Sequence, residues 1–208
     1  MDFLGAIMQR AMDFVYGVTG NYGLVIILLT GFIRVLLLPF TLAQTRSSQK
    51  MQELQPIISK LQKEYKNDPT RLNQETMALW KKNGVNPLSS CLLLLVQFPF
   101  IIAFFQALQS YEPLKTATFI GFELGKPDPW ILPILAGITT YFQVKVSSPP
   151  NNAQSQTMLV VFPLLIGWMS RTFAAALSLY WVVSNLFSIG ERYLVPKTGV
   201  AKGESTGR

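Results

Sequence analysis

Long apolar runs alternate with one dense polar block along this chain of 208 residues. Residues 21–40, 87–109, 130–146 and 157–195 are almost wholly apolar, whereas residues 43–86 are rich in charged and amide side chains. A helix of about 20 residues rises roughly 30 Å, which is the thickness of the hydrocarbon core of a bilayer. The pattern therefore predicts an all-α membrane protein.

The last apolar run is too long for one crossing. A single helix over residues 157–195 would reach roughly 58 Å, about twice the hydrocarbon thickness. The polar triplet Ser170-Arg171-Thr172 interrupts the run, so we expect two spans, 157–170 and 174–194, joined by a tight turn. With spans 21–40, 87–109 and 130–146 this makes five transmembrane helices. Pro39 marks a place where the first helix bends or ends.

Two amphipathic segments complete the predicted fold. Residues 2–17 place apolar side chains at helical spacing, which predicts a helix that lies in the membrane interface or packs on the rest of the protein. Residues 43–86 carry two such stretches separated by Asn67-Asp68-Pro69, which predicts an antiparallel helical hairpin outside the membrane. Residues 1–195 then form one membrane-embedded core, and residues 196–208 form a flexible basic tail.

Charge orients the predicted helices. The net charge is +7, and eight of the 18 basic residues fall between Arg46 and Lys82 against four acidic ones. Basic loops stay on the cytoplasmic side, so we expect a cytoplasmic hairpin and carboxyl terminus and an external amino terminus. The nearest partner of this charge is anionic lipid, not nucleic acid.

The composition argues against most enzyme chemistry. The chain has no histidine and one cysteine, Cys91, so the usual proton shuttle, a disulfide and a cysteine-cluster metal site are all absent. The spans lack paired aspartates, and no glycine-rich phosphate loop occurs. We therefore expect neither an enzyme nor a cofactor or metal site. No cleavable signal peptide is evident in residues 1–20.

Arg34 is the residue most indicative of function. It lies within the first span, about 13 Å along a helix from the polar block, where a charge costs at least ~2.5–3.5 kcal/mol. The spans hold no acidic residue except Glu191, late in the last one. This favours a hydrated, unpaired Arg34 in a wet cavity over a buried ion pair. Snorkelling to the inner headgroups is the alternative.

Other polar side chains occur at comparable depths in the predicted spans. Each alone is more often a contact between helices than a site, but together with Arg34 they could line a hydrophilic pocket. They are Thr30, Gln97, Gln106, Ser178, Ser184 and Asn185.

Six motifs follow one another along the chain: Ile33-Arg34-Val35-Leu36-Leu37-Leu38-Pro39-Phe40, Met51-Gln52-Glu53-Leu54-Gln55-Pro56, Leu61-Gln62-Lys63-Glu64-Tyr65-Lys66, Asn83-Gly84-Val85-Asn86-Pro87-Leu88, Gln97-Phe98-Pro99 and Leu179-Tyr180-Trp181-Val182-Val183-Ser184-Asn185. In these motifs and their order, over about residues 20–195, the chain resembles the YidC/Oxa/Alb family of membrane protein insertases. It resembles the short bacterial YidC form, which lacks a large external domain. Two places depart from the family, where it often has Gly-Cys-Leu-Pro and Pro-Ala-Gly: here they read Ser90-Cys91-Leu92-Leu93 and Ala174-Ala175-Ala176.

The resemblance implies a multi-pass protein of the bacterial plasma membrane with a positively charged groove open to the cytoplasm and to lipid. Acidic segments of client proteins would meet Arg34, and client helices would slide along the second and last spans. The implied groove residues are Arg34, Gln97, Tyr180, Trp181, Thr30 and Ser184. The implied partners are newly made membrane proteins and the bilayer, with the ribosome and the Sec translocon as further candidates. A channel or transporter subunit with an anion site at Arg34, or a purely structural subunit, stays as an alternative.

Overall fold

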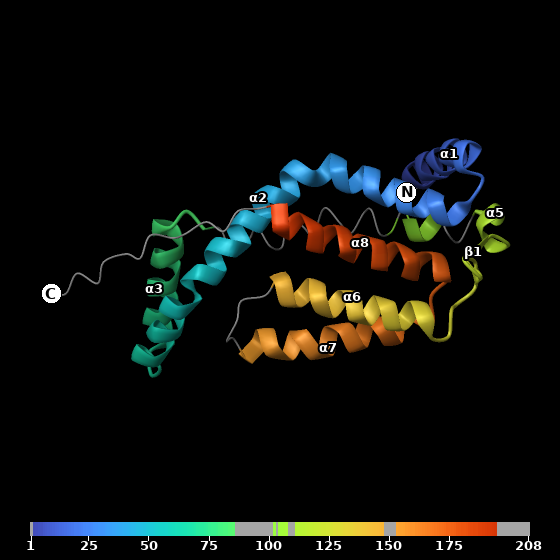
Figure 1. The fold of residues 1–208 in the computed structure, drawn as a ribbon. Coiled ribbons are helices and arrows are strands. Elements are labelled where there is room, and N and C mark those ends of the chain that lie inside the picture. The colour runs from blue at the N-terminus through green and yellow to red at the C-terminus, as the bar shows by residue number, and fades with distance from the viewer. Residues whose placement is uncertain (1, 86–101, 103, 108–110, 148–152, 195–208) are drawn as a thin grey trace.

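The fold is almost entirely helical (Figure 1). The structure, a computed structural model, describes residues 2–85, 102, 104–107, 111–147 and 153–194. Its helices are α1 (Asp2–Thr19), α2 (Tyr22–Glu64), α3 (Pro69–Lys82), α5 (Glu112–Lys115), α6 (Ile131–Ser147), α7 (Ala153–Ser170) and α8 (Ala175–Leu194). The strands β1 (Thr118–Phe119) and β2 (Phe122–Glu123) form a small antiparallel ribbon in which Thr118 pairs with Glu123.

Helix α2 is one continuous helix of 43 residues. Of the two outcomes expected at Pro39, a bend or an end, the helix does not end there, and the polar block from residue 43 begins within the same helix. Pro39 and Pro56 both lie inside α2, because proline removes one backbone hydrogen bond but its fixed φ is already helical. The apolar first half and the polar second half of α2 are therefore mechanically coupled, and α2 bends on its way to α3 (Figure 1).

The second half of α2 packs against α3. The chain turns between Glu64 and Pro69, and the Asp68 carboxylate caps α3 by accepting a hydrogen bond from the Arg71 amide. A small apolar cluster fastens the two helices together: Leu54, Ile58 and Val85 are buried, with Met51, Leu79 and Trp80 packed around them. This pair of helices thus has a core of its own.

Helices α2, α6, α7 and α8 lie side by side as the body of the molecule (Figure 1). Residues from α6, α7 and α8 meet at Ala136, Ile166 and Val182. Between α6 and α7, Gly137 and Gly167 face each other so closely that an added Cβ would lie 3.2–3.3 Å from a backbone carbonyl oxygen. Small residues at such a crossing allow helix backbones to approach without a hydrophobic driving force.

The largest apolar cluster lies where α1 and the loop after residue 110 meet α2 and α8. Met12, Val25, Leu124 and Ala176 are fully buried there. The Tyr111 hydroxyl donates to the Asp13 carboxylate, and burial together with this bond raises the pKa of Tyr111. Helix α1 therefore packs on the protein, although its Phe14 stays 76% exposed.

The observed helices can be set beside the predicted spans. Helix α6 matches span 130–146 within a residue, α8 matches 174–194, and α7 begins four residues before the predicted 157. Most of the predicted span 87–109, and the tail 196–208, lie outside the described residues, although residues 102 and 104–107 are helical. In the described part of the chain, α2 alone is both long and apolar enough to cross a bilayer; α6 and residues 156–170 are apolar but shorter.

Candidate functional site

Arg34 of α2 points at α8 and binds two of its side chains. Its Nη1 lies 3.6 Å from Glu191 Oε2, and its Nη2 donates a hydrogen bond of 2.5 Å to Ser184 Oγ. Both charged side chains are withdrawn from the surface, with 14% of Arg34 and 7% of Glu191 exposed. Ser184 and Glu191 are seven residues apart, so they lie two turns apart on one face of α8.

The expectation of an unpaired Arg34 is therefore wrong. In the sequence Glu191 is the one carboxylate at a nearby depth, but its distance from Arg34 depends on which face of α8 meets α2. A buried arginine is stabilised by a carboxylate and a hydroxyl, because each satisfies donors that apolar surroundings leave without partners. Arg34 has such a partner within the protein itself.

A polar pocket of about 220 Å³ lies on one side of the Arg34–Glu191 pair. We call it the polar pocket; three helices line it with amide, hydroxyl and charged side chains. Its lining is Arg34, Thr41, Gln44, Thr45 and Ser48 of α2, Gln143 and Ser147 of α6, and Ser188, Glu191 and Arg192 of α8. A pocket with this lining is suited to water or to a polar stretch of polypeptide.

Arg192 and Gln52 hold the three helices together beside the polar pocket. Arg192 Nη2 donates to Gln52 Oε1 at 2.6 Å, and Gln52 Nε2 donates to the Ser147 carbonyl oxygen at 2.5 Å. Gln52 belongs to the polar half of α2, Arg192 to α8 and Ser147 to the end of α6. The long α2 thus ties the predicted membrane core to the region near α3.

An apolar groove of about 450 Å³, also lined by the pair, lies between α2 and α8. We call it the α2–α8 groove. Apart from Arg34 and Glu191 its lining is apolar: Val35, Leu38, Leu186, Phe187, Gly190 and Leu194. Arg34 and Glu191 line both cavities, so the ion pair stands at the boundary between a polar compartment and an apolar surface.

The other residues implied for the groove are distributed differently. The Thr30 hydroxyl donates to the Ile26 carbonyl oxygen of its own helix and is buried. Tyr180 is buried against Phe104, with ring centroids 4.6 Å apart, and Trp181 Nε1 donates to Thr140 Oγ1 of α6. Gln97 lies outside the described residues. Of the implied residues that the structure describes, Ser184 is the one that contacts Arg34.

The sequence also contained residues of this site that its pattern did not reveal. Thr41, Gln44 and Ser48 stand past Pro39, where the sequence predicted the end of the first span. Their spacing of three and four residues places them on one face of a helix with Arg34. That spacing was a usable signal, but reading it required α2 to continue through Pro39.

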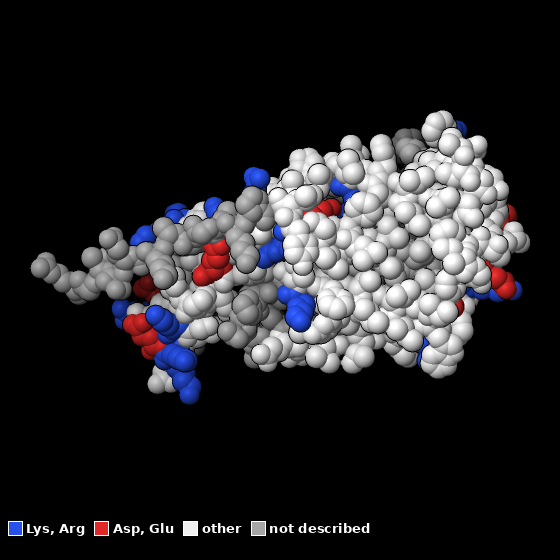
Figure 2. Space-filling model, viewed as in Figure 1, with Lys and Arg blue, Asp and Glu red and all other residues white. Residues whose placement is uncertain are grey.

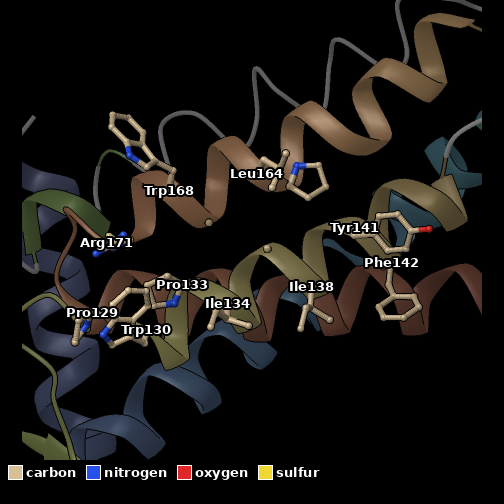
Figure 3. Close-up of a pocket in the computed structure, with 13 residues that line it drawn as sticks. Pro129, Trp130, Pro133, Ile134, Ile138, Tyr141, Phe142, Leu164, Trp168 and Arg171 are labelled. Carbon is tan, nitrogen blue, oxygen red and sulfur yellow. The ribbon is translucent and has the colours of Figure 1, made fainter.

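A third cavity, of about 560 Å³, lies between α6 and α7 (Figure 3). Trp130 and Arg171 lie at one end, where the Arg171 guanidinium stacks 4.6 Å from the centre of the Trp130 ring, and Tyr141 and Phe142 lie at the other. Its lining is otherwise almost wholly apolar. This cavity is suited to apolar chains and offers a polar segment few partners.

Charge is distributed by region on the molecular surface (Figure 2). Lysine and arginine side chains gather around α3 and the far half of α2, a smaller mixed group lies at the α1 end, and the broad middle is nearly free of exposed charge (Figure 2). On the face that Figure 2 shows, a wide, nearly uncharged region between two polar ends is the surface expected of a protein that sits in a bilayer.

The helices surround the charged Arg34–Glu191 pair, and the face in Figure 2 is nearly uncharged across its middle. These features define a helical membrane protein with a polar site between its helices. Residues 14–202 match the family described as the 60Kd inner membrane protein. The chain belongs to this family, so the predicted kinship with the YidC/Oxa/Alb insertases is confirmed and the chain is a membrane protein.

Curated relatives carry the same designation. The chain is 44% identical over 195 residues to "Membrane protein insertase YidC" of Oceanobacillus iheyensis, with 88% of this chain and 77% of that protein covered. It is 43% identical over 204 residues to "Membrane protein insertase MisCA" of Bacillus subtilis, covering 94% of this chain and 78% of that protein. With "Membrane protein insertase YidC" of Caldanaerobacter subterraneus it shares 37% identity, over 95% and 97% of the two chains.

The fold is similar to that of a solved structure. The match, "Active YidC insertase crystal structure with the first transmembrane domain resolved", has a TM-score of 0.78 over 94% of this chain at 24% sequence identity. This chain spans 47% of the length of that one. At this level of identity the likeness shows the fold, and the YidC-like helical fold is therefore confirmed.

Proposed function

We propose that this chain is a membrane protein insertase and chaperone. It takes short hydrophilic segments of client proteins across the inner leaflet by way of the polar pocket and releases their apolar helices into lipid along the α2–α8 groove. No covalent step is required, because burial of an apolar helix of about 20 residues supplies the free energy. The proposal includes neither a cofactor nor an enzymatic reaction.

The position of Arg34 carries this proposal. A client has a polar segment and an adjoining apolar helix, and Arg34 lies where a polar pocket and an apolar groove share a wall. A fixed positive charge lowers the cost of bringing an acidic segment to this depth, since the electrostatic attraction is strong where water is scarce. An anion site alone would not need the apolar groove beside it.

The proposed orientation follows from the two polar ends of the molecule. Five helices cross the plasma membrane of a bacterium, with the α3 end in the cytoplasm and the α1 end outside, because the basic residues gather at the α3 end. The polar pocket then opens on the cytoplasmic side. Newly made membrane proteins are the proposed clients, and the exposed basic residues of α3 suit anionic lipid, the ribosome or the Sec translocon.

Reconstitution into liposomes tests the function. The purified chain should increase the protease-protected fraction of a single-span client whose external segment is short and acidic, relative to empty liposomes. An anion-sensitive dye inside the same liposomes reports channel activity. Anion flux without insertion would favour the channel alternative, and neither activity would favour a structural subunit.

A further inference from the structure

The insertion mechanism leaves the role of Glu191 open. Its carboxylate occupies the place beside Arg34 that the proposed function gives to an acidic client. Of the described residues that line the polar pocket and the α2–α8 groove, Glu191 is the one acid. The side chain lies 3.6 Å from Arg34 and is 7% exposed, so it is already where a client carboxylate must arrive.

We propose that Glu191 is a built-in competitor: its carboxylate holds Arg34 in the empty protein and must be displaced by an acidic client, which limits how strongly acidic clients are preferred over neutral ones. This inference rests on the proposed insertase function. It adds a specificity-determining residue on α8 to the arginine on α2. A neutral client has nothing to exchange with Glu191 and enters without breaking the pair.

The geometry of the pair suits an exchangeable contact. Strong arginine–carboxylate pairs are bidentate, with two parallel hydrogen bonds of about 2.7–2.9 Å. Here the described ion pair is one Nη1–Oε2 approach of 3.6 Å, and Glu191 Oε1 is buried with no hydrogen-bond partner among the described residues. The second guanidinium nitrogen is held by Ser184 instead. The pair therefore positions Arg34 but leaves it available to a better acceptor.

The position of the pair also suits a competition between Glu191 and a client carboxylate for Arg34. Arg34 and Glu191 line both the polar pocket and the α2–α8 groove, so a segment that passes from one to the other contacts the pair. The neighbouring cation Arg192 binds Gln52 and the carbonyl oxygen of Thr45. Arg34 is thus the cation that faces Glu191. Loss of the Glu191 contact would release Arg34 and leave the contacts of Arg192 in place.

Binding of matched probes tests the inference. The full chain in nanodiscs is titrated with two single-span peptides that differ by two aspartates or two asparagines in the external segment. Apparent affinity falls in proportion to the fraction of molecules that are competent to bind. If the pair is intact in about nine molecules of ten, Glu191→Gln strengthens binding of the aspartate peptide about tenfold and leaves the asparagine peptide nearly unchanged. The gain should vanish in Arg34→Gln/Glu191→Gln.

Two variants act as controls. Glu112→Gln makes the same chemical change at an exposed carboxylate, 79% accessible and paired with Lys115 far from the site, and should alter neither affinity. If Glu191→Gln does not fold, Glu191→Asp is measured in its place. Its carboxylate is one methylene shorter, which lengthens the pair, so it should strengthen binding of the aspartate peptide in the same direction by less.

The outcomes separate the inference from the function. Unchanged or weaker binding of the aspartate peptide by Glu191→Gln, with loss of binding in Arg34→Gln, overturns the competitor and leaves the insertase function standing. Equal binding of both peptides, independent of Arg34, overturns the proposed role of Arg34 itself. A gain that appears equally with both peptides shows that Glu191 acts by packing and also overturns the inference.

Discussion

At the scale of single residues, the Arg34–Glu191 pair adds little net stability, but removing one of its partners is costly. Two buried charges lose hydration that their attraction barely repays, whereas removing one partner strands the other and costs about 3–5 kcal/mol. Ser184 reduces this cost by accepting a hydrogen bond from the guanidinium. A variant of Arg34 therefore changes both the site and the stability of the helices that hold it.

Stability and function can be separated with a double variant. Arg34→Ala should lower the melting temperature, because Glu191 is left buried without its partner, and should abolish insertion of an acidic client, because the positive charge is gone. Arg34→Ala/Glu191→Gln should recover most of the melting temperature but not the insertion, and Arg34→Lys should retain much of the insertion. Thermal unfolding in detergent and the liposome assay measure the two effects. Insertion restored by the double variant would contradict a direct role for the arginine charge.

At the scale of elements, α2 does two tasks in one helix. Its first half packs in the main core through Val25, Ile26 and Leu29, and its second half forms a separate core with α3 around Leu54 and Ile58. A helix of 43 residues reaches roughly 65 Å, about twice the hydrocarbon thickness. Because no loop interrupts α2, a displacement of its α3 end would also move the residues near Arg34.

The separate core of α2 and α3 makes a local prediction. Leu54→Ala should destabilise the packing of these helices by about 2–5 kcal/mol, because Leu54 is 1% exposed and its removal leaves a cavity. Limited proteolysis should then cut near residues 64–69, while the unfolding of the main core is unchanged. Ile57→Ala, on the exposed side of the same turn, is the matched control.

We also expect shortening of residues 51–82 to impair insertion without preventing expression; normal insertion would show that this region is dispensable.

At the scale of the whole molecule, the segments predicted to be external gather at one end and those predicted to be cytoplasmic at the other. Helix α1, α5, the β-ribbon and the turn between α7 and α8 lie together, and α3 lies at the opposite end (Figure 1). Helices α2 and α8 run in the same direction between these ends (Figure 1). This arrangement puts the basic α3 region at one end and the predicted external segments at the other, and Arg171 in the turn between α7 and α8 is an exception to the charge pattern.

Cysteine labelling tests the orientation. In a Cys91→Ser background, Lys126→Cys in the loop before α6 should react with a membrane-impermeant maleimide in intact cells. Lys82→Cys at the end of α3 should react only after permeabilisation, because we expect that end in the cytoplasm. Both positions are exposed, so accessibility within the protein does not limit either reaction. The reverse pattern would invert the proposed topology.

The sequence by itself determined the class of the protein and the positions of most of its helices. Periodicity and run length are local properties of the chain, and they report burial in lipid or protein wherever it occurs. The polar triplet at residues 170–172 separated α7 from α8 for the same reason. The family motifs likewise identified the family, and the charge inside an apolar run singled out Arg34.

Only the tertiary structure decided which residues contact Arg34. The partnership with Glu191 and Ser184 joins residues 150 or more positions apart, and it depends on which faces of α2 and α8 meet. The burial of Tyr180 and the bond from Trp181 to Thr140 depend on the same packing. Pro39 carried a local signal to bend or end the helix, and α2 does not end there, because packing along both halves of α2 outweighs one missing hydrogen bond.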